Sequence, residues 1–293
     1  MLFVPGHISR MIEKAAGAGA DCVVLDLEDA VPPASKNEAR KIIRLVLQDG
    51  RFDRQAVMVR VNSFDTGRTA EDVASVACAE LDGFVYAMSR NRGEIHAMSR
   101  LLSEQEKALG LPAGHFALIP LIETAEGVLN AAEIAAASSR VVALLFGGED
   151  YLAEMSGTHD DDQLCFLWPR VQVIAAARAA GVEPIDTPHV DVHDSEGLAA
   201  HLRRGRQLGM DGVLVMSPRQ IPAAHEVYTP SQAAVGEARC ILVKLEEMRG
   251  AGRGLMIEEG VYVSPVAEKK ALTLLARVEA LEQMATGQTK RGG

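Results

Sequence analysis

Basic residues are in the minority in this chain of 293 residues, with 30 Lys and Arg against 40 Asp and Glu and a net charge of -10. Binding to nucleic acid or to an anionic membrane requires a basic face, so the charge balance argues against both partners. Aromatic residues are also scarce, at 4 Tyr, 7 Phe and 1 Trp, which leaves little material for stacking bases or sugars. A small anionic ligand held by a few local Arg or Lys side chains fits this composition.

Cysteine is sparse as well. The 4 cysteines are far apart and form no C-x-x-C pair; they are Cys22, Cys78, Cys165 and Cys240. This pattern is typical of reduced, mostly buried thiols in a cytoplasmic protein. The longest apolar runs have the length of a strand, and the first lacks the features of a signal peptide, so we expect neither export nor a membrane span.

Several catalytic signatures are missing. The chain contains no G-x-S-x-G elbow and no Cys-His signature, which argues against a covalent nucleophile. It also lacks a glycine-rich phosphate fingerprint between a strand and a helix. An open nucleotide-binding sheet is therefore not favoured.

Short apolar runs instead alternate with longer amphipathic segments along most of the chain. The runs predict strands at Leu2–Val4, Cys22–Leu27, Ala56–Val61, Gly83–Met88, Phe116–Ile122, Val141–Phe146, Val182–Ile185 and Gly212–Met216. The longer segments predict helices at Ile8–Ala18, Lys36–Gln48, Thr69–Ala79, Glu94–Leu109, Cys165–Ala180 and Glu196–Leu208. Such a series of β/α units predicts an α/β fold, a (β/α)8 TIM barrel over residues 1–230.

The remaining segment is not needed to close a barrel. Residues 231–287 predict a C-terminal helical extension with helices at Gln232–Arg249 and Val266–Ala285 and a short hairpin around Met256–Val263. We expect this extension to cap the mouth of the barrel or to dock onto another subunit. Residues 288–293 are expected to form a disordered tail.

Two acids follow neighbouring strands of the predicted barrel, Glu123 after Ile122 and Asp150 after Phe146. Working residues of such barrels lie at the carboxyl ends of the strands, and oxygen ligands suit a hard cation such as Mg²⁺. The pair therefore predicts a metal site. Each acid alone has a structural alternative, because Glu123 could complement a helix dipole and Asp150 could cap a helix.

Other polar residues also lie at the carboxyl ends of predicted strands. Arg60, in the sequence Val-Arg-Val-Asn, is expected to clamp a carboxylate, with a structural salt bridge as the alternative. Glu28 and Asp29 follow the second strand as catalytic candidates, or they simply begin a turn. Asn62 also belongs to the end of the third strand, and Asp186 and Asp191 follow the seventh. An excess of acids with one Arg indicates a metal and an anionic substrate.

Two further clusters resemble metal sites but are interpreted as loops. His159 precedes three consecutive aspartates, a run of like charge that is typical of a solvated loop. His189, Asp191 and His193 alternate in a way that could bind a transition metal, and solvent-facing histidines are the simpler interpretation.

Six sequence blocks appear in an order that resembles the citrate lyase beta-subunit-like family of the aldolase/citrate lyase superfamily. They are Leu2-Phe-Val-Pro-Gly6, Leu25-Asp-Leu-Glu-Asp-Ala30, Val59-Arg-Val-Asn62, Leu121-Ile-Glu-Thr124, Gly147-Gly-Glu-Asp-Tyr151 and Ser217-Pro-Arg-Gln-Ile221. The resemblance runs over nearly the whole chain. It implies a TIM barrel that assembles as a homotrimer or hexamer and acts on a 2-oxo acid and a thioester of CoA or of a carrier protein.

The resemblance also implies residue roles. Glu123 and Asp150 correspond to the Mg²⁺ ligands, and Arg60 corresponds to the residue that binds the substrate carboxylate. Four residues near the start of the chain fall where the family approaches CoA or substrate, namely Pro5, Gly6, Arg10 and Lys14. The implied activity is cleavage of a citryl-, citramalyl- or malyl-type thioester.

Four positions depart from the family pattern. Met88 and Val213 stand where a Lys is usual, and Ser217 stands where a His or Asn is usual. Val263 occupies the place of an Asp that the lyases lend to a neighbouring subunit, and Glu258 or Glu259 are the nearby acids that could replace it. Altered catalysis, such as thioester hydrolysis or condensation, or a binding role without lyase activity, are therefore the alternatives to a lyase.

Overall fold

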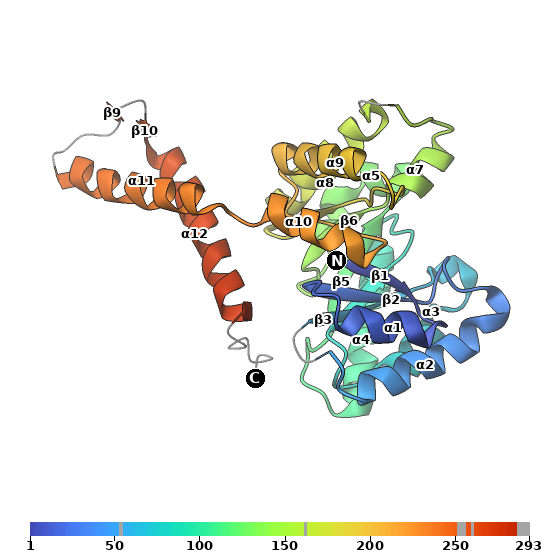
Figure 1. Ribbon diagram of the computed structural model, residues 1–293. Coiled ribbons are helices and arrows are strands. Elements are labelled where there is room, and N and C mark those ends of the chain that lie inside the picture. The colour runs from blue at the N-terminus through green and yellow to red at the C-terminus, as the bar shows by residue number, and fades with distance from the viewer. Residues whose placement is uncertain (53–54, 161–162, 251–255, 259–260, 286–293) are drawn as a thin grey trace. The chain divides into compact units, whose positions relative to one another are not determined.

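The computed structural model describes residues 1–52, 55–160, 163–250, 256–258 and 261–285 (Figure 1). The chain divides into two compact units, Met1–His225 and Glu226–Gly293. In the described part of the chain, no helix has both the length and the apolar character needed to cross a membrane.

The first unit is built on one sheet of eight parallel strands that follow the order of the sequence. The strands are β1 (Leu2–Pro5), β2 (Cys22–Asp26), β3 (Ala56–Val61), β4 (Gly83–Tyr86), β5 (Ala117–Ile122), β6 (Ala143–Phe146), β7 (Glu183–Asp186) and β8 (Gly212–Val213). A parallel bridge between Leu2 and Val215 joins the last strand region to the first, and the amide of Phe3 donates to the carbonyl of Val215 at 3.0 Å. The sheet thus closes, and the predicted TIM-like barrel is confirmed.

Every second residue of the strands fills the barrel interior, as the two-residue repeat of a strand requires. The interior cluster includes Val24, Met58, Leu121, Leu145 and Leu214, none of which is more than 4% exposed. The intervening residues pack outward against helices. Strands buried on both faces explain why these runs read as almost continuously apolar in the sequence.

Helices pack on the outside of the barrel (Figure 1). They are α1 (Ser9–Ala16), α2 (Lys36–Gln48), α3 (Thr69–Val76), α4 (Arg92–Leu109), α5 (Ala125–Leu129), α6 (Ala131–Ala135), α7 (Gly148–Glu154), α8 (Leu164–Ala180), α9 (Ser195–Leu208) and α10 (Ile221–Tyr228), with short 3-10 turns at Pro33–Ser35, Phe64–Thr66 and Pro218–Gln220. Local signals set the ends of α4, because the Asn91 side chain accepts from the Glu94 amide and Gly110 ends the helix at φ 68°.

Strand β4 ends at Tyr86, two residues before the predicted end at Met88. The difference has a structural reason, since Met88 adopts the left-handed conformation with φ 53°. A residue other than glycine rarely adopts this backbone, which costs about 1 kcal/mol or more and ends the strand.

The second unit contains α11 (Gln232–Gly250) and α12 (Pro265–Ala285), which pack against each other. Strands β9 (Met256–Glu258) and β10 (Val261–Val263) pair antiparallel between them. The predicted tail, residues 288–293, lies outside the described residues.

Candidate active site

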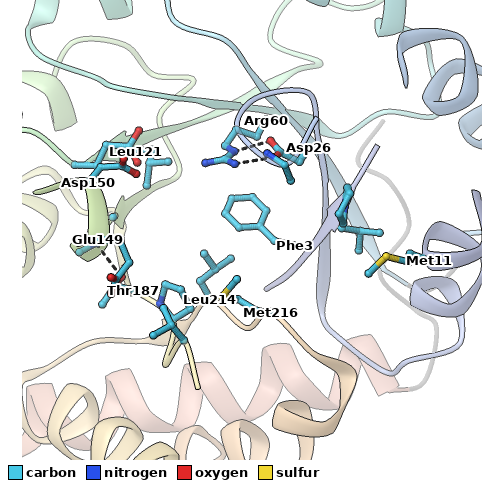
Figure 2. A pocket seen from close by; sticks show the side chains of 18 residues that line it. Phe3, Met11, Asp26, Arg60, Leu121, Glu149, Asp150, Thr187, Leu214 and Met216 are labelled. Atoms are coloured by element: carbon cyan, nitrogen blue, oxygen red, sulfur yellow. Dashed lines mark hydrogen bonds and ion pairs between the residues drawn. The ribbon is translucent and has the colours of Figure 1, made fainter. Parts of the chain in front are cut away.

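A cavity of about 380 Å³ lies at the carboxyl ends of the barrel strands (Figure 2). Its lining comes from several strands and the loops after them, as in other barrels of this type. The lining residues are Phe3, Val4, Pro5, Met11, Asp26, Ala30, Arg60, Leu121, Glu123, Gly147, Gly148, Glu149, Asp150, Thr187, Pro188, Val190, Leu214 and Met216. The structure therefore brings Glu123, Asp150 and Arg60 together in one site.

Arg60 lies two residues after Met58 on β3 and therefore faces the barrel interior as Met58 does. Asp26 does the same on β2 above Val24, and the two residues are register partners in the sheet. The guanidinium donates from Nε to Oδ1 of Asp26 at 2.6 Å and from Nη2 to Oδ2 at 2.8 Å. Figure 2 shows this pair beside Phe3, whose ring centroid lies 4.7 Å from the guanidinium carbon.

Asp26 is the functional residue that the sequence analysis missed. It is 1% exposed, and its oxygens also accept from the amides of Glu28 and Ala30, each at 2.9 Å. Burial alone would raise the pKa of Asp26, but Arg60 and the backbone donors outweigh burial and lower it. The two-residue alternation Val24–Asp26 was the sequence signal that could have identified this acid.

Glu28 lies behind Arg60 and does not line the cavity. Its Oε2 is 2.9 Å from Nη1 of Arg60. Burial raises the pKa of Glu28 from 4.5 to about 7, and Arg60 opposes this rise. Asp29 is exposed and its amide donates to Glu28, so both residues lie in the turn after β2. The side chain of Glu28 is therefore connected to the cavity only through its contact with Arg60, and Asp29 does not line the cavity.

The raised pKa of Glu28 predicts a pH dependence of stability. The native state binds this proton more tightly than the unfolded chain, so the stabilisation is fully present below pH 4.5 and is lost as the pH rises towards about 7. The unfolding free energy of the wild type should therefore fall with rising pH in this range. We expect the Glu28→Gln variant to lose this part of the fall, which is roughly 1 kcal/mol per pH unit. Urea unfolding of both proteins between pH 4.5 and 7.5 measures the difference. The same change at Glu38, which is exposed on α2, is the control, and parallel curves for wild type and Glu28→Gln would contradict the prediction.

Glu123 follows β5 at the inward position above Leu121 and is 3% exposed. Its Oε1 accepts from the amide of Met88 at 2.7 Å, which explains why Met88 holds its unusual backbone. Gly147 leaves the room that Glu123 needs, since a Cβ there would come within 2.7 Å of Oε2. Burial raises the pKa of Glu123 well above its usual value; Arg60 opposes this and Asp150 adds to it.

Asp150 lies in the first turn of α7 and is exposed to the cavity. Figure 2 shows it on the same side of the cavity as Leu121 and Glu149. Glu149 is engaged elsewhere, because its Oε2 is 3.1 Å from Nε2 of His159. The two predicted metal ligands thus share one wall.

This donor set fits a hard divalent cation. A cation beside Glu123 would offset the burial and the charge of Asp150 that raise the pKa of Glu123, and so would favour its ionised form. Within the described ranges, no group of three or more His, Cys, Asp or Glu residues could hold a metal ion. Two carboxylates with the remaining positions left to water and substrate is the pattern that Mg²⁺ prefers.

The residues predicted near the thioester are divided by the structure. Pro5 lines the cavity, and Gly6 is buried beside it, where a Cβ would meet the carbonyl oxygen of Asp26 at 2.4 Å. Arg10 and Lys14 are exposed on α1 and do not line the cavity. Met11, on the same helix, does reach it.

Asp186 does not face the mouth of the barrel as expected. It is fully buried and accepts from Nε of Arg170 at 2.8 Å. Nδ1 of His201 lies 3.2 Å from Nη2 of Arg170, and Nε2 of His201 lies 2.9 Å from the carbonyl oxygen of Thr187. Because guanidinium nitrogens only donate, Nδ1 accepts and the proton resides on Nε2. Thr187 in turn accepts from the amide of Gly148 at 2.8 Å, so this buried network fixes the start of α7.

Two other candidates also have structural roles. Asn62 donates to the carbonyl of Leu27 at 2.9 Å and to Asp72 at 2.6 Å, below the cavity. Asp191 accepts from the amide of His193 at 2.9 Å. In the cluster of His189, Asp191 and His193, Nε2 of His189 lies 3.3 Å from Oδ2 of Asp194. In the cluster that begins at His159, Asp161 and Asp162 lie outside the described residues.

The departures from the family pattern take local structural roles where they are described. Val213 is 3% exposed, Ser217 caps the turn at Pro218–Gln220, and Met88 supports Glu123 through its amide. The side chains of Val263 and Glu258 and the whole of Glu259 lie outside the described residues.

The family model described as HpcH/HpaI aldolase/citrate lyase matches residues 1–218, most of the barrel unit. The chain belongs to this family. The resemblance inferred from the six sequence blocks is thereby confirmed. Members similar to this chain are oxo-acid lyases, and some are thioesterases.

Curated relatives cover nearly the whole chain. The citrate lyase subunit beta of Leuconostoc mesenteroides is 33% identical over 263 residues, covering 90% of this chain and 87% of the relative. An L-malyl-CoA/beta-methylmalyl-CoA lyase of Cereibacter sphaeroides is 32% identical, covering 96% and 94%. A (3S)-malyl-CoA thioesterase of the same organism is also 32% identical with the same coverage.

Solved structures agree with this assignment. The protein CitE of Mycobacterium tuberculosis, in complex with magnesium, acetoacetate and coenzyme A, is 30% identical with a TM-score of 0.75, covering 95% of this chain and 97% of that one. A citrate lyase from Burkholderia xenovorans is 19% identical with a TM-score of 0.84, covering 99% and 95%, and supports the fold alone.

Proposed function

We propose that this protein is a Mg²⁺-dependent carbon–carbon lyase that cleaves a citryl-, citramalyl- or malyl-type acyl thioester into a 2-oxo acid and an acyl thioester. The observation that carries the proposal is the convergence of Glu123, Asp150 and Arg60 on one cavity. The lyases among the relatives, and the magnesium and coenzyme A bound by the Mycobacterium protein, support it.

In this proposal Glu123 and Asp150 hold the Mg²⁺, which when bound would polarise the oxygens of the oxo acid and offset negative charge. Arg60 adds a second positive charge at the same place, held in position by Asp26. The buried surroundings strengthen this electrostatic stabilisation because little water screens it.

The reaction breaks the bond between the carbon that bears the hydroxyl and the carbon next to the thioester. The hydroxyl loses its proton to a general base and becomes the keto group, while the electron pair of the broken bond stays on the carbon next to the thioester carbonyl, and this carbon takes up a proton. We propose that Glu258 or Glu259 of the C-terminal extension supplies the proton that this carbon takes up, because Val263, at the position of the usual Asp, has no acidic group. Unchanged turnover in the Glu258→Gln, Glu259→Gln double variant would refute this assignment.

We further propose that residues 231–287 act as a lid or docking segment in a cytoplasmic homotrimer or hexamer. Thioester hydrolysis is the second candidate function, favoured by Val263 and by a thioesterase that is as similar to this chain as the lyases are.

One assay separates the candidates. We expect the protein, incubated with Mg²⁺ and citramalyl-, malyl- or citryl-CoA, to release an oxo acid without free thiol. Pyruvate, glyoxylate and oxaloacetate are followed by coupled dehydrogenases, and the thiol by a chromogenic reagent. Free thiol without an oxo acid would instead establish hydrolysis, and ligand binding without either product would refute both reactions. Carrier-protein thioesters in a parallel series identify the thioester partner.

A further inference from the structure

The charges around the active-site cavity are strongly unbalanced. Arg60 is the only cation among the lining residues in the described ranges, whereas Asp26, Glu123, Glu149 and Asp150 all line it. A substrate with several negative charges therefore finds one cationic side chain, together with the metal that Glu123 and Asp150 would hold.

The positive charge of Arg60 is already shared. Its Nε and Nη2 donate to Asp26 at 2.6 and 2.8 Å, and Nη1 lies 2.9 Å from Glu28. Arg60 is fixed by these contacts, so it has no freedom to follow a carboxylate to another part of the cavity. One substrate carboxylate beside the metal and Arg60 is accommodated, but a second carboxylate has no partner of its own.

The surface away from the metal ligands is apolar. Phe3 and Leu214 form part of the cavity lining and also pack on the barrel interior. Met216 extends this surface after β8, and Figure 2 shows Leu214 and Met216 next to Phe3. Such a surface gains from contact with a methyl group and loses when it buries an unpaired carboxylate.

Resting on the proposed lyase function, we propose that the oxo acid of this site is a 2-oxo monocarboxylate with a short apolar substituent, of the pyruvate class, and not a dicarboxylate of the oxaloacetate class. The corresponding thioester bears a methyl group on the carbon that carries the hydroxyl. Glyoxylate lacks the methyl group and is the weaker ligand by about 10-fold, as expected for the loss of one apolar group.

Calorimetric titration of the full chain with Mg²⁺ tests this without any thioester. Pyruvate is expected to bind at least about 100-fold more tightly than oxaloacetate, because the second carboxylate is buried unpaired. Oxaloacetate is used fresh, and its conversion to pyruvate is quantified in each titration. Equal or tighter binding of oxaloacetate overturns the proposal. A titration in which none of the three oxo acids binds overturns it as well.

The variant Met216→Arg provides a direct check, since it adds a cation to the apolar surface at a residue that is 49% exposed. We expect the preference for pyruvate over oxaloacetate to fall by at least about 10-fold. The matched control is Met155→Arg, which adds the same charge at a residue that is 52% exposed and does not line the cavity, and it should leave the ratio within about 3-fold. An unchanged preference in Met216→Arg would count against the proposal. A pyruvate preference in a protein that forms no product would refute the lyase reaction alone.

Discussion

Replacing Glu123 by glutamine or Asp150 by asparagine is expected to weaken Mg²⁺ binding by at least about 100-fold and to abolish turnover. The estimate follows from the 10- to 100-fold effects of changing even the residues that support metal ligands, since these two acids are the proposed ligands themselves. Each change keeps the size of the side chain and removes only its charge. Calorimetric titration with Mg²⁺, followed by product analysis at saturating metal, measures both effects.

The control is Glu126→Gln, the same substitution three residues along at an exposed position of α5 that does not line the cavity. It should leave Mg²⁺ affinity within about 2-fold of wild type. The metal-free Glu123→Gln protein should unfold at the same temperature or higher, because burial disfavours the charge of Glu123. Metal binding that survives both Glu123→Gln and Asp150→Asn would disprove the site.

Arg60→Met is expected to destabilise the protein by about 3–5 kcal/mol and to lower turnover by about 100- to 1000-fold. The stability loss arises because Asp26 would remain buried without its cation. The loss of turnover arises because a fixed positive charge near the reacting oxygens is removed. Urea unfolding and steady-state kinetics measure the two effects separately.

A double variant separates structure from catalysis. Asp26→Asn combined with Arg60→Met should regain a large part of the lost stability, since the buried charge of Asp26 is removed together with its cation, but turnover should remain low. Arg100→Met, on the exposed face of α4, should change stability by less than about 0.5 kcal/mol. If the double variant is as unstable as Arg60→Met alone, the ion pair does not account for the effect.

The sequence predicted the barrel well because its signals are local. The segments Lys36–Gln48 and Ala56–Val61 agree with α2 and β3 residue for residue, since amphipathic repeats and apolar runs depend only on neighbouring residues. The predicted end of β4 at Met88 was wrong because its left-handed backbone depends on Glu123, which lies 35 positions away in the sequence.

The site was predicted in part for the same reason. Glu123, Asp150 and Arg60 follow or end apolar strands, and the structure places all three in the cavity. Asp26 was not predicted because the strand was expected to run on to Leu27, which placed Glu28 and Asp29 just beyond its end. Arg170 gave no signal, since its burial depends on Asp186, from the neighbouring strand β7.

Asp26 and Arg60 are register partners on adjacent strands, which gives the pairing of β2 with β3 a second importance. A slip of one residue by either strand would turn its own member of the pair out of the barrel towards the helices and separate the two side chains. Correct strand pairing and assembly of the cationic site are thus a single folding event. Any chain that misaligns these two strands loses the Asp26–Arg60 pair and part of its barrel lining together, so we expect such molecules to be inactive even before they lose their compact structure.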